Sequence, residues 1–340
     1  MQQVFYMVQK KVGVLEYHDE KYILDVMDIV RKKTGAEVSF IGLRDYDFSD
    51  FSQYSVIFDM ISPFNKYIAE IMKVYYLNGT YVINNPFATS TYNKIMQAYK
   101  LVEMNMPAPK TVVLPNTPDD SESDFIVKPF FKDIVKKFKF PIIMKPYDGF
   151  ANQGVYAVNS YKEIEKIWEE NKNRIMLVQE AIVPVDYYRV FTINKKHMYF
   201  LKREPRFVEA KKYSYKDYTL LTPSLRKYIE KKTIEINKEM SYDLSTIEWS
   251  ITKDKKAFVI DVNDAPNIAD AEKAKKMDLF FPAEAYDFIV KHLSEMIIEK
   301  VNMDPHKRDI QMSEDFATTI KSIVKGLKYN LHENLKLRHG

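Results

Sequence analysis

Short apolar runs and helix-spaced apolar positions alternate through the first hundred residues. Runs at residues 11–16, 55–59 and 80–84 have the length of buried strands. Between and after them, apolar residues recur at helical spacing, and one such helix is expected over residues 90–104. This alternation of strands and helices predicts a parallel sheet with helices packed on its faces.

The pattern changes after a polar stretch at residues 115–124, which is the best candidate for a linker. Beyond it, apolar runs come in pairs that indicate antiparallel hairpins, so the expected fold class is α/β with α+β parts. The pairs are 141–145 with 154–158, 190–193 with 198–201, and 247–251 with 257–262. We expect an N-terminal α/β domain, a central and a C-terminal α+β subdomain and a charged helical extension, with bounds at 1–114, 115–183, 184–301 and 302–340.

The composition excludes several classes of protein. Hydrophobic residues make up 46% of the 340 positions and charged residues 29%, which is enough apolar material for a sizeable core. Lys and Arg number 51 against 47 Asp and Glu, and a net charge of +4 does not indicate a nucleic-acid partner. Cysteine is absent, and neither a signal peptide nor a membrane-length apolar run is found, so we expect a cytoplasmic protein without disulfides or membrane contact. The 8 glycines form neither a G-x-G-x-x-G nor a P-loop motif, and the histidines form no H-E-x-x-H motif.

Two acids and an amide in the C-terminal half form the strongest candidate site. An uninterrupted hairpin centred between residues 254 and 255 would place Glu248 directly opposite Asp261, and Asn263 would share their face. Facing carboxylates repel each other unless a cation lies between them, and three oxygen donors suit Mg2+. The alternative is a solvated strand face that carries an accidental acidic pair.

A lysine followed by two glycines suggests a phosphate-binding loop. Lys145 ends an apolar run, and Gly149 and Gly154 bound a short loop whose backbone N–H groups could cover phosphates. The alternative is an ordinary hairpin turn beside a lysine that extends into solvent.

Two further sets of residues are candidates for nucleotide contact. Gln179, Glu180 and Ile182 lie where an apolar run ends, and a strand edge there could offer backbone groups to an adenine ring. Arg189 and Arg203 flank the hairpin expected over 190–201, and guanidinium groups stabilise charge on a transferred phosphoryl group. The alternatives are an exposed strand end and solvated arginines.

The order of these features resembles the ATP-grasp superfamily, most nearly its RimK-like carboxylate–amine ligases. The resemblance covers roughly residues 11–300, and Lys94, in YNKIMQAYKLVEMNMPAPKTVVLP, matches an ATP-phosphate lysine of that family. The segment VIFDMISPFNKYIAEIMKVYYLNGTYVINNPF is similar to a subgroup of RimK-like proteins. The resemblance implies two subdomains that sandwich ATP, and it assigns roles to the candidates. Lys94 and Lys145 would hold the phosphates, and Glu180 and Ile182 would contact adenine. Mg2+ would be bound by Glu248, Asp261 and Asn263. Arg203 would contact the γ-phosphate during its transfer.

The implied activity is an ATP- and Mg2+-dependent ligation that proceeds through an acyl phosphate and releases ADP. The expected partners are a small-molecule or peptide carboxylate and an amine, and a homo-oligomer is compatible with the sequence. Asp59, Ser62 and Asn84 follow the expected parallel strands and would face the acceptor. Met60 stands where many relatives have an arginine, and the usual Asn-x-x-x-Gly-Gly stretch has no match, so the acceptor's identity is not implied.

Two other functions stay open at this stage. One is a small-molecule kinase of the inositol-phosphate type, for which a basic cluster is available at Lys195, Lys196, Lys202, Arg203, Arg206, Lys211 and Lys212. The other is an ATP-binding regulator without turnover. The intact set of acids argues against the regulator, because ATP binding alone does not need two metal-directed carboxylates.

Overall fold

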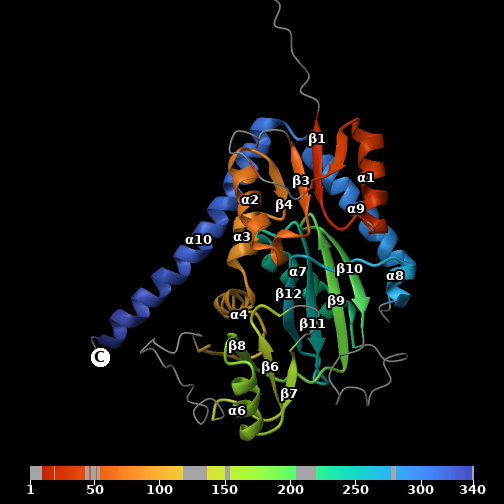
Figure 1. Cartoon of the computed structure of the whole chain (residues 1–340). Helices are drawn as coiled ribbons and strands as arrows, with labels where there is room; N and C mark the ends of the chain where they lie inside the picture. The colour runs from red at the N-terminus through yellow and green to blue at the C-terminus, as the bar shows by residue number, and fades with distance from the viewer. Residues whose placement is uncertain are drawn as a thin grey trace, which may run out of the picture.

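The first sheet is parallel, as the sequence pattern predicted. In the computed structural model, its strands lie in the order β2-β1-β3-β4 (Figure 1). They are β1 (Lys11–Leu15), β2 (Glu37–Phe40), β3 (Val56–Asp59) and β4 (Tyr81–Ile83). All side chains of β3 and β4 are buried, which is typical of parallel strands covered on both faces. The structure describes residues 10–18, 20–42, 46, 51, 54–117, 136–149, 154–203, 220–276 and 281–338.

Helices α1 (Lys21–Thr34) and α2 (Lys66–Leu77) connect these strands. Gly35 ends α1 in the left-handed conformation, at φ +68°, which glycine adopts without steric cost. The single helix expected over residues 90–104 is wrong, because the chain forms α3 (Pro86–Thr91) and α4 (Lys94–Glu103) instead. The Asn93 side chain accepts the N–H groups of the first turn of α4, and this cap sets Lys94 at the start of the new helix.

The second sheet is antiparallel, in the order β10-β9-β11-β12. Its strands are β9 (Asp186–Ile193), β10 (His197–Lys202), β11 (Leu244–Ile251) and β12 (Ala257–Asn263). Helix α7 (Pro223–Glu239) packs on one face, where the buried Trp249 donates a hydrogen bond of 3.1 Å to Thr233 Oγ1. The other face joins the core of the first sheet, so one hydrophobic cluster spans both.

The third sheet is also antiparallel and has the order β5-β8-β6-β7, with helix α6 (Tyr161–Glu170) packed against it. Its strands are β5 (Thr111–Leu114), β6 (Ile142–Pro146), β7 (Tyr156–Val158) and β8 (Met176–Glu180). The expected domain bound at residue 114 places β5 with the first sheet, but β5 pairs with β8. The hydrogen-bond ladder with β8 makes β5 part of the central sheet. Most of the expected linker, from residue 118 on, lies outside the described residues.

Three helices close the chain: α8 (Ala271–Lys276), α9 (Ala283–Asn302) and α10 (Pro305–Arg338). Helix α9 packs against α1, β3, β9 and β10, so it joins the first sheet to the second. Helix α10 begins beside α3 and then runs away from the body of the molecule (Figure 1). Among the described residues, no helix is both long and apolar enough to cross a membrane.

Candidate active site

The predicted opposition of Glu248 and Asp261 across the β11–β12 hairpin is confirmed. The uniform register that predicted it is wrong near the turn, where Ile251 pairs with Ala257 and Trp249 pairs with Val259. The register then shifts by one residue between Trp249 and Glu248, and this bulge turns Asp261 to the face of Glu248. Bulges are common beside active sites because they redirect a side chain in this way.

Two lysines from other parts of the chain meet at Asp261. Lys94 Nζ, at the start of α4, lies 2.8 Å from Asp261 Oδ1 and 3.1 Å from Oδ2. Lys145 Nζ, near the end of β6, lies 3.8 Å from Oδ1. Lys94 and Lys145, separated by 51 positions in the printed sequence, therefore converge on one carboxylate.

Glu248 is held by two side chains of the neighbouring strand β9. Arg189 Nε donates to Glu248 Oε1 at 3.1 Å, and a second guanidinium nitrogen contacts the same oxygen. The Tyr187 hydroxyl donates to Glu248 Oε2. Tyr187 was not among the candidates, although it lies two residues before Arg189 and strand alternation places both on one face.

The charges in this cluster shift one another's pKa values. Burial raises the pKa of both carboxyls, but Arg189 together with the Tyr187 hydroxyl offsets burial at Glu248, and Lys94 together with Lys145 offsets it at Asp261, so both pKa values fall below their ordinary range. Burial lowers the pKa of Lys145, whereas at Lys94 the ion pair with Asp261 outweighs burial and raises the pKa. Both acids are therefore ionised at neutral pH, as ligands of a hard cation must be.

Asn263 follows on the same strand, and its Oδ1 accepts the Ala265 N–H at 3.1 Å. The next residue, Asp264, is a further acid that the sequence reading missed. Burial raises its pKa to about 6, and the nearby Asp59 carboxyl adds to the rise. The adjacent motif D-x-N-D carries the signal, since its last acid follows directly on the candidate metal residues.

A small pocket lies beside this cluster, between α4, the third sheet and strand β12 of the second sheet. Its lining includes residues from α4, β5, β6, β8 and β12, among them Lys94, Gln97, Thr111, Lys145, Gln179 and Asp261. Within it, Gln179 Nε2 donates to Thr111 Oγ1 at 2.9 Å. The pocket thus places the candidate phosphate lysines and one predicted adenine residue around one space.

The other predicted nucleotide residues lie at the rim of this region. Glu180 ends β8, where its backbone N–H donates to the Lys110 carbonyl at 2.9 Å, and Ile182 follows two residues later. Gly149 ends the described part of the loop, since residues 150–153 lie outside the described residues. Gly154 resumes it at φ +71°, where a Cβ would lie 3.3 Å from the ring of Pro146.

Arg203 directly follows β10, and its backbone N–H donates to the Tyr187 carbonyl at 2.9 Å. This bond extends the β9–β10 ladder by one residue and sets Arg203 beside the residue that contacts Glu248. The rest of the predicted basic cluster, from Arg206 to Lys212, lies outside the described residues.

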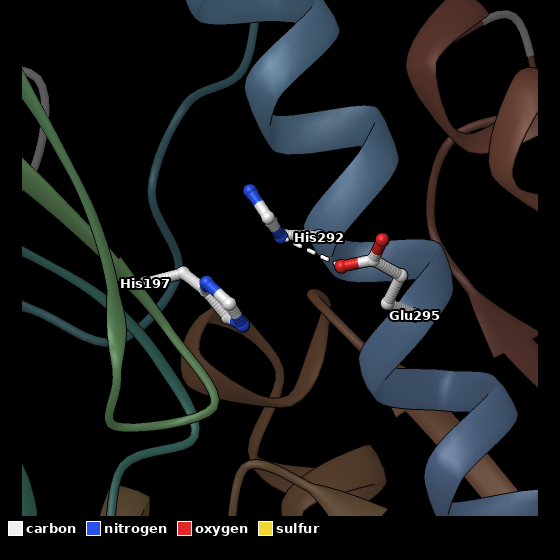
Figure 2. A group of neighbouring side chains, drawn as sticks. All are labelled: His197, His292 and Glu295. Carbon is white, nitrogen blue, oxygen red and sulfur yellow. Dashed lines mark hydrogen bonds and ion pairs between the residues drawn. The ribbon is translucent and has the colours of Figure 1, made fainter.

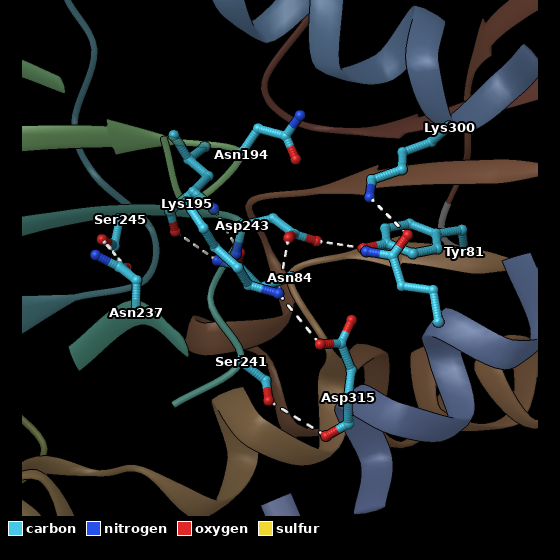
Figure 3. Close-up of polar contacts among 12 residues, drawn as sticks. Tyr81, Asn84, Asn194, Lys195, Asn237, Ser241, Asp243, Ser245, Lys300 and Asp315 are labelled. Atoms are coloured by element: carbon cyan, nitrogen blue, oxygen red, sulfur yellow. Dashed lines mark hydrogen bonds and ion pairs between the residues drawn. The ribbon is translucent and has the colours of Figure 1, made fainter. Parts of the chain in front are cut away.

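The three predicted acceptor residues have different surroundings. Asp59 Oδ1 accepts the N–H groups of Ile61 and Ser62, both at 2.9 Å, and so forms a local turn after β3. The Asn84 amide donates to the carbonyls of Leu244 and Asp264 and accepts two N–H groups, which ties the first sheet to β11 (Figure 3). Asn84 therefore uses its full hydrogen-bonding capacity within the protein.

The family that the sequence features suggested is confirmed by a comparison with family models. The model of the RimK-like ATP-grasp domain matches residues 92–282, which is more than half of the 340 residues. The chain belongs to this family of ATP-dependent ligases. No curated protein matches the sequence significantly.

Solved structures with the same fold include three bacterial ATP-grasp proteins. D-alanyl-alanine synthetase A of Vibrio cholerae has a TM-score of 0.61 at 15% identity, over 87% of this chain and 98% of the other. A RimK-domain ATP-grasp protein of Sphaerobacter thermophilus scores 0.57 at 16% identity, over 83% and 98%. D-alanine–D-alanine ligase of Bacillus anthracis, complexed with ATP, scores 0.55 at 15% identity, over 86% and 99%. These likenesses confirm the ATP-grasp fold.

Proposed function

We propose that the protein joins a carboxylate to an amine at the expense of ATP. The carboxylate attacks the γ-phosphorus to give an acyl phosphate and ADP, and the amine then displaces inorganic phosphate to leave an amide. One observation carries the proposal: Lys94, Lys145 and Arg189 converge on the paired carboxylates of Glu248 and Asp261. Such a concentration of opposite charges beside a pocket suits phosphoryl transfer, which depends on positioning and electrostatic stabilisation.

The residues present fit Mg2+. Glu248 and Asp261 are ionised oxygen donors on one face, and Asn263 adds a neutral oxygen two residues along that face. Glu248, Asp261 and Asn263 would hold the ion, whose positive charge would offset the negative charge of the ATP phosphates during transfer. Lys94 and Lys145 would then exchange their contacts with Asp261 for phosphate oxygens.

The remaining candidates would enclose the reactants. Gly149 and Gly154 bound the loop proposed to cover the phosphates, and closure there would exclude water that would hydrolyse the acyl phosphate. Gln179 and the backbone of Glu180 and Ile182 would contact adenine. The acceptor would approach the end of the first sheet that carries Asp59, Ser62 and Asn84. In this proposal the nucleotide lies between the central and C-terminal subdomains.

Steady-state phosphate release across a panel of acids and amines tests the reaction class. A ligase releases phosphate only when acid and amine are both present, and hydroxylamine traps its acyl phosphate as a hydroxamate. A phosphorylated alcohol would instead identify a kinase, and ATP binding without turnover would identify a regulator. Glu248→Gln with Asp261→Asn should remove the magnesium-dependent part of the ATP-induced rise in melting temperature. A full magnesium effect in that variant would contradict the metal assignment.

Arg203 is proposed to act on the phosphoryl group in transfer, with Arg189 held at Glu248. An interaction that strengthens in the transition state lowers the barrier without tightening substrate binding. Arg203→Ala should therefore lower kcat by about 10²–10³-fold and change KM for ATP only a few-fold. Arg203→Lys should recover little activity, because an ammonium group cannot reproduce the planar fork of donors. Arg226→Ala, on the exposed ion pair with Glu230, is the control and should keep kcat.

A further inference from the structure

Two histidines and a glutamate meet where β10 packs on α9. His197 is the first residue of β10, and His292 and Glu295 lie one turn apart on α9 (Figure 2). The two imidazole rings stack with centroids 4.0 Å apart and an interplanar angle of 13°. One ligand atom from each of the three side chains lies within 4.8 Å of the other two.

The packing of β10 on α9 produces this meeting. Alternate residues of β10 face the helix, so Tyr199 packs on Phe288 with ring centroids 5.5 Å apart, and His197 meets His292 one step further along. The step from Tyr199 to His197 along the strand is about 6.8 Å, and the step from Phe288 to His292 along the helix is about 6.0 Å. Because these two distances are similar, both pairs of rings can be in contact at once. The packing of Tyr199 on Phe288 therefore brings the two imidazole rings together.

We propose that His197, His292 and Glu295 bind a zinc-class divalent cation that links β10 to α9. Two imidazoles and a carboxylate are a donor set that suits Zn2+, Co2+ or Cu2+ rather than Mg2+, and a water would complete a tetrahedral site. Tetrahedral bonds of 2.0–2.2 Å require donors about 3.4 Å apart, so the two rings would turn out of their stacked arrangement to direct one nitrogen each at a shared cation.

The electrostatic surroundings agree with cation binding. The Glu295 carboxylate lies 2.7 Å from His292 Nδ1 and is half exposed, which leaves the site open to ions in solution. Within the described part of the chain, no side chain hydrogen-bonds to the His197 ring, and burial together with His292 lowers its pKa. The nearby Lys196 is paired with Glu299 at 3.4 Å, which offsets its repulsion of a cation.

The proposed cation would stabilise the packing of β10 on α9, and this role does not depend on the proposed ligase reaction. Helix α9 packs against α1 and β3 of the first sheet as well as against β9 and β10. A metal bond between β10 and α9 would therefore fix the antiparallel sheet to the helix that holds the N-terminal sheet. Such a bond stabilises the folded chain by an amount that grows with the logarithm of the free metal concentration above the dissociation constant.

Zinc titration of the untagged full chain, in competition with a chromophoric chelator and without ATP, tests the proposal. One Zn2+ should bind per chain and raise the melting temperature. His197→Ala and His292→Ala should each weaken binding by at least about 100-fold, since even outer-shell changes cost 10–100-fold. His306→Ala, at an exposed histidine of α10, should bind zinc as the wild type does.

Two variants keep the result decisive if a histidine variant folds poorly. Glu295→Gln leaves both rings and the packed core in place, so it should fold normally and bind zinc less tightly. Glu248→Gln with Asp261→Asn should keep the zinc site, which separates it from the candidate active site. Absence of zinc binding, or binding that survives the His197, His292 and Glu295 substitutions, would overturn the proposal.

Discussion

At the scale of single residues, Asp59 carries a carboxyl that is 6% exposed at the end of β3. Burial raises its pKa above the ordinary value of 3.8, although hydrogen bonds from Ser62 and Ile61 work in the other direction. The folded chain therefore holds the Asp59 proton more tightly than the unfolded chain does. By linkage, this residue costs stability as the pH rises above 3.8 toward its folded pKa.

Asp59→Asn should remove this cost, because the amide oxygen can still accept the two N–H groups while carrying no charge. We expect the variant to be more stable than the wild type at pH 7, and the difference to shrink as the pH falls toward 4. Urea unfolding at pH 4, 5.5 and 7 measures it. If Asp59 contacts the acceptor as proposed, the same variant loses activity while gaining stability. A variant less stable than the wild type at pH 7 would contradict the account.

Lys195 is a second buried ionisable residue whose pKa is shifted by its surroundings. Its Nζ lies 3.2 Å from both Asp243 and Asp315, and Asp243 also accepts a hydrogen bond of 2.6 Å from the Tyr81 hydroxyl (Figure 3). Burial opposes the charged lysine, but Asp243 and Asp315 outweigh it and raise the pKa of Lys195. Asp243 is 3% exposed, so it depends on this cation.

Lys195→Met should destabilise the chain by about 3–5 kcal/mol, because removal of one partner leaves a buried charge unpaired. The adjacent Lys196 gives a matched control, since it and Glu299 are 56% and 46% exposed. Lys196→Met should cost less than about 1 kcal/mol, as exposed pairs do. Denaturant unfolding at pH 7 measures the loss of stability in each variant. Equal losses would show that the buried ion pairs of Lys195 contribute no more to stability than the exposed pair of Lys196.

At the scale of secondary-structure elements, local chemistry explains what could be predicted. Glu248 and Asp261 were placed opposite each other by a uniform register that the strands do not follow near the turn, and the bulge that brings them opposite each other has no clear sequence signal. The break before Lys94 was missed because an Asn cap competes with an apolar helical pattern. The group of His197 with His292 depends on packing between distant elements, which a pattern along the chain does not contain.

The loop between β6 and β7 gives a prediction at this scale. Gly154 has φ +71°, and Gly35 at the end of α1 has nearly the same value, +68°. Gly154→Ala and Gly35→Ala should each cost about 1–2 kcal/mol, the cost of a left-handed conformation for a residue with a Cβ. Only Gly154→Ala should also raise KM for ATP, because its loop is proposed to cover the phosphates. An equal KM for ATP in the two variants would show that the loop does not take part in nucleotide binding.

At the scale of the whole molecule, the sequence predicted which parts form parallel and which form antiparallel sheets, but it did not predict how the sheets pack together. The parallel and antiparallel parts follow from local periodicity, whereas β2 was missed because just one of its four residues is buried. Helices α9 and α10 return to the N-terminal sheet from the far end of the sequence. The resulting contacts join residues separated by more than two hundred positions, such as Tyr76 with Met312.

The first half of α10 is part of the fold and belongs to the segment that the sequence indicated only as a charged helical extension from residue 302. The Tyr76 hydroxyl donates to the Met312 carbonyl at 2.6 Å, and Phe316 packs edge-on against Phe87 with ring centroids 4.9 Å apart. Asp315 pairs with Lys195 of the second sheet. One helical segment thus contacts both the N-terminal sheet, through α2 and α3, and the antiparallel sheet.

Two truncations test this division of α10. A chain that ends after residue 321 keeps these contacts, and its melting temperature should stay within about 2 °C of the full chain, which corresponds to less than about 1 kcal/mol. A chain that ends after residue 304 loses Asp315 beside the buried Lys195 and uncovers Phe87, so it should be destabilised by several kcal/mol, about the cost of breaking a buried pair. Thermal melts of both chains decide between the two cases. If the shorter chain melted with the full one, the contacts of α10 would add nothing to stability, and residues 302–340 would be only the charged helical extension that the sequence indicated.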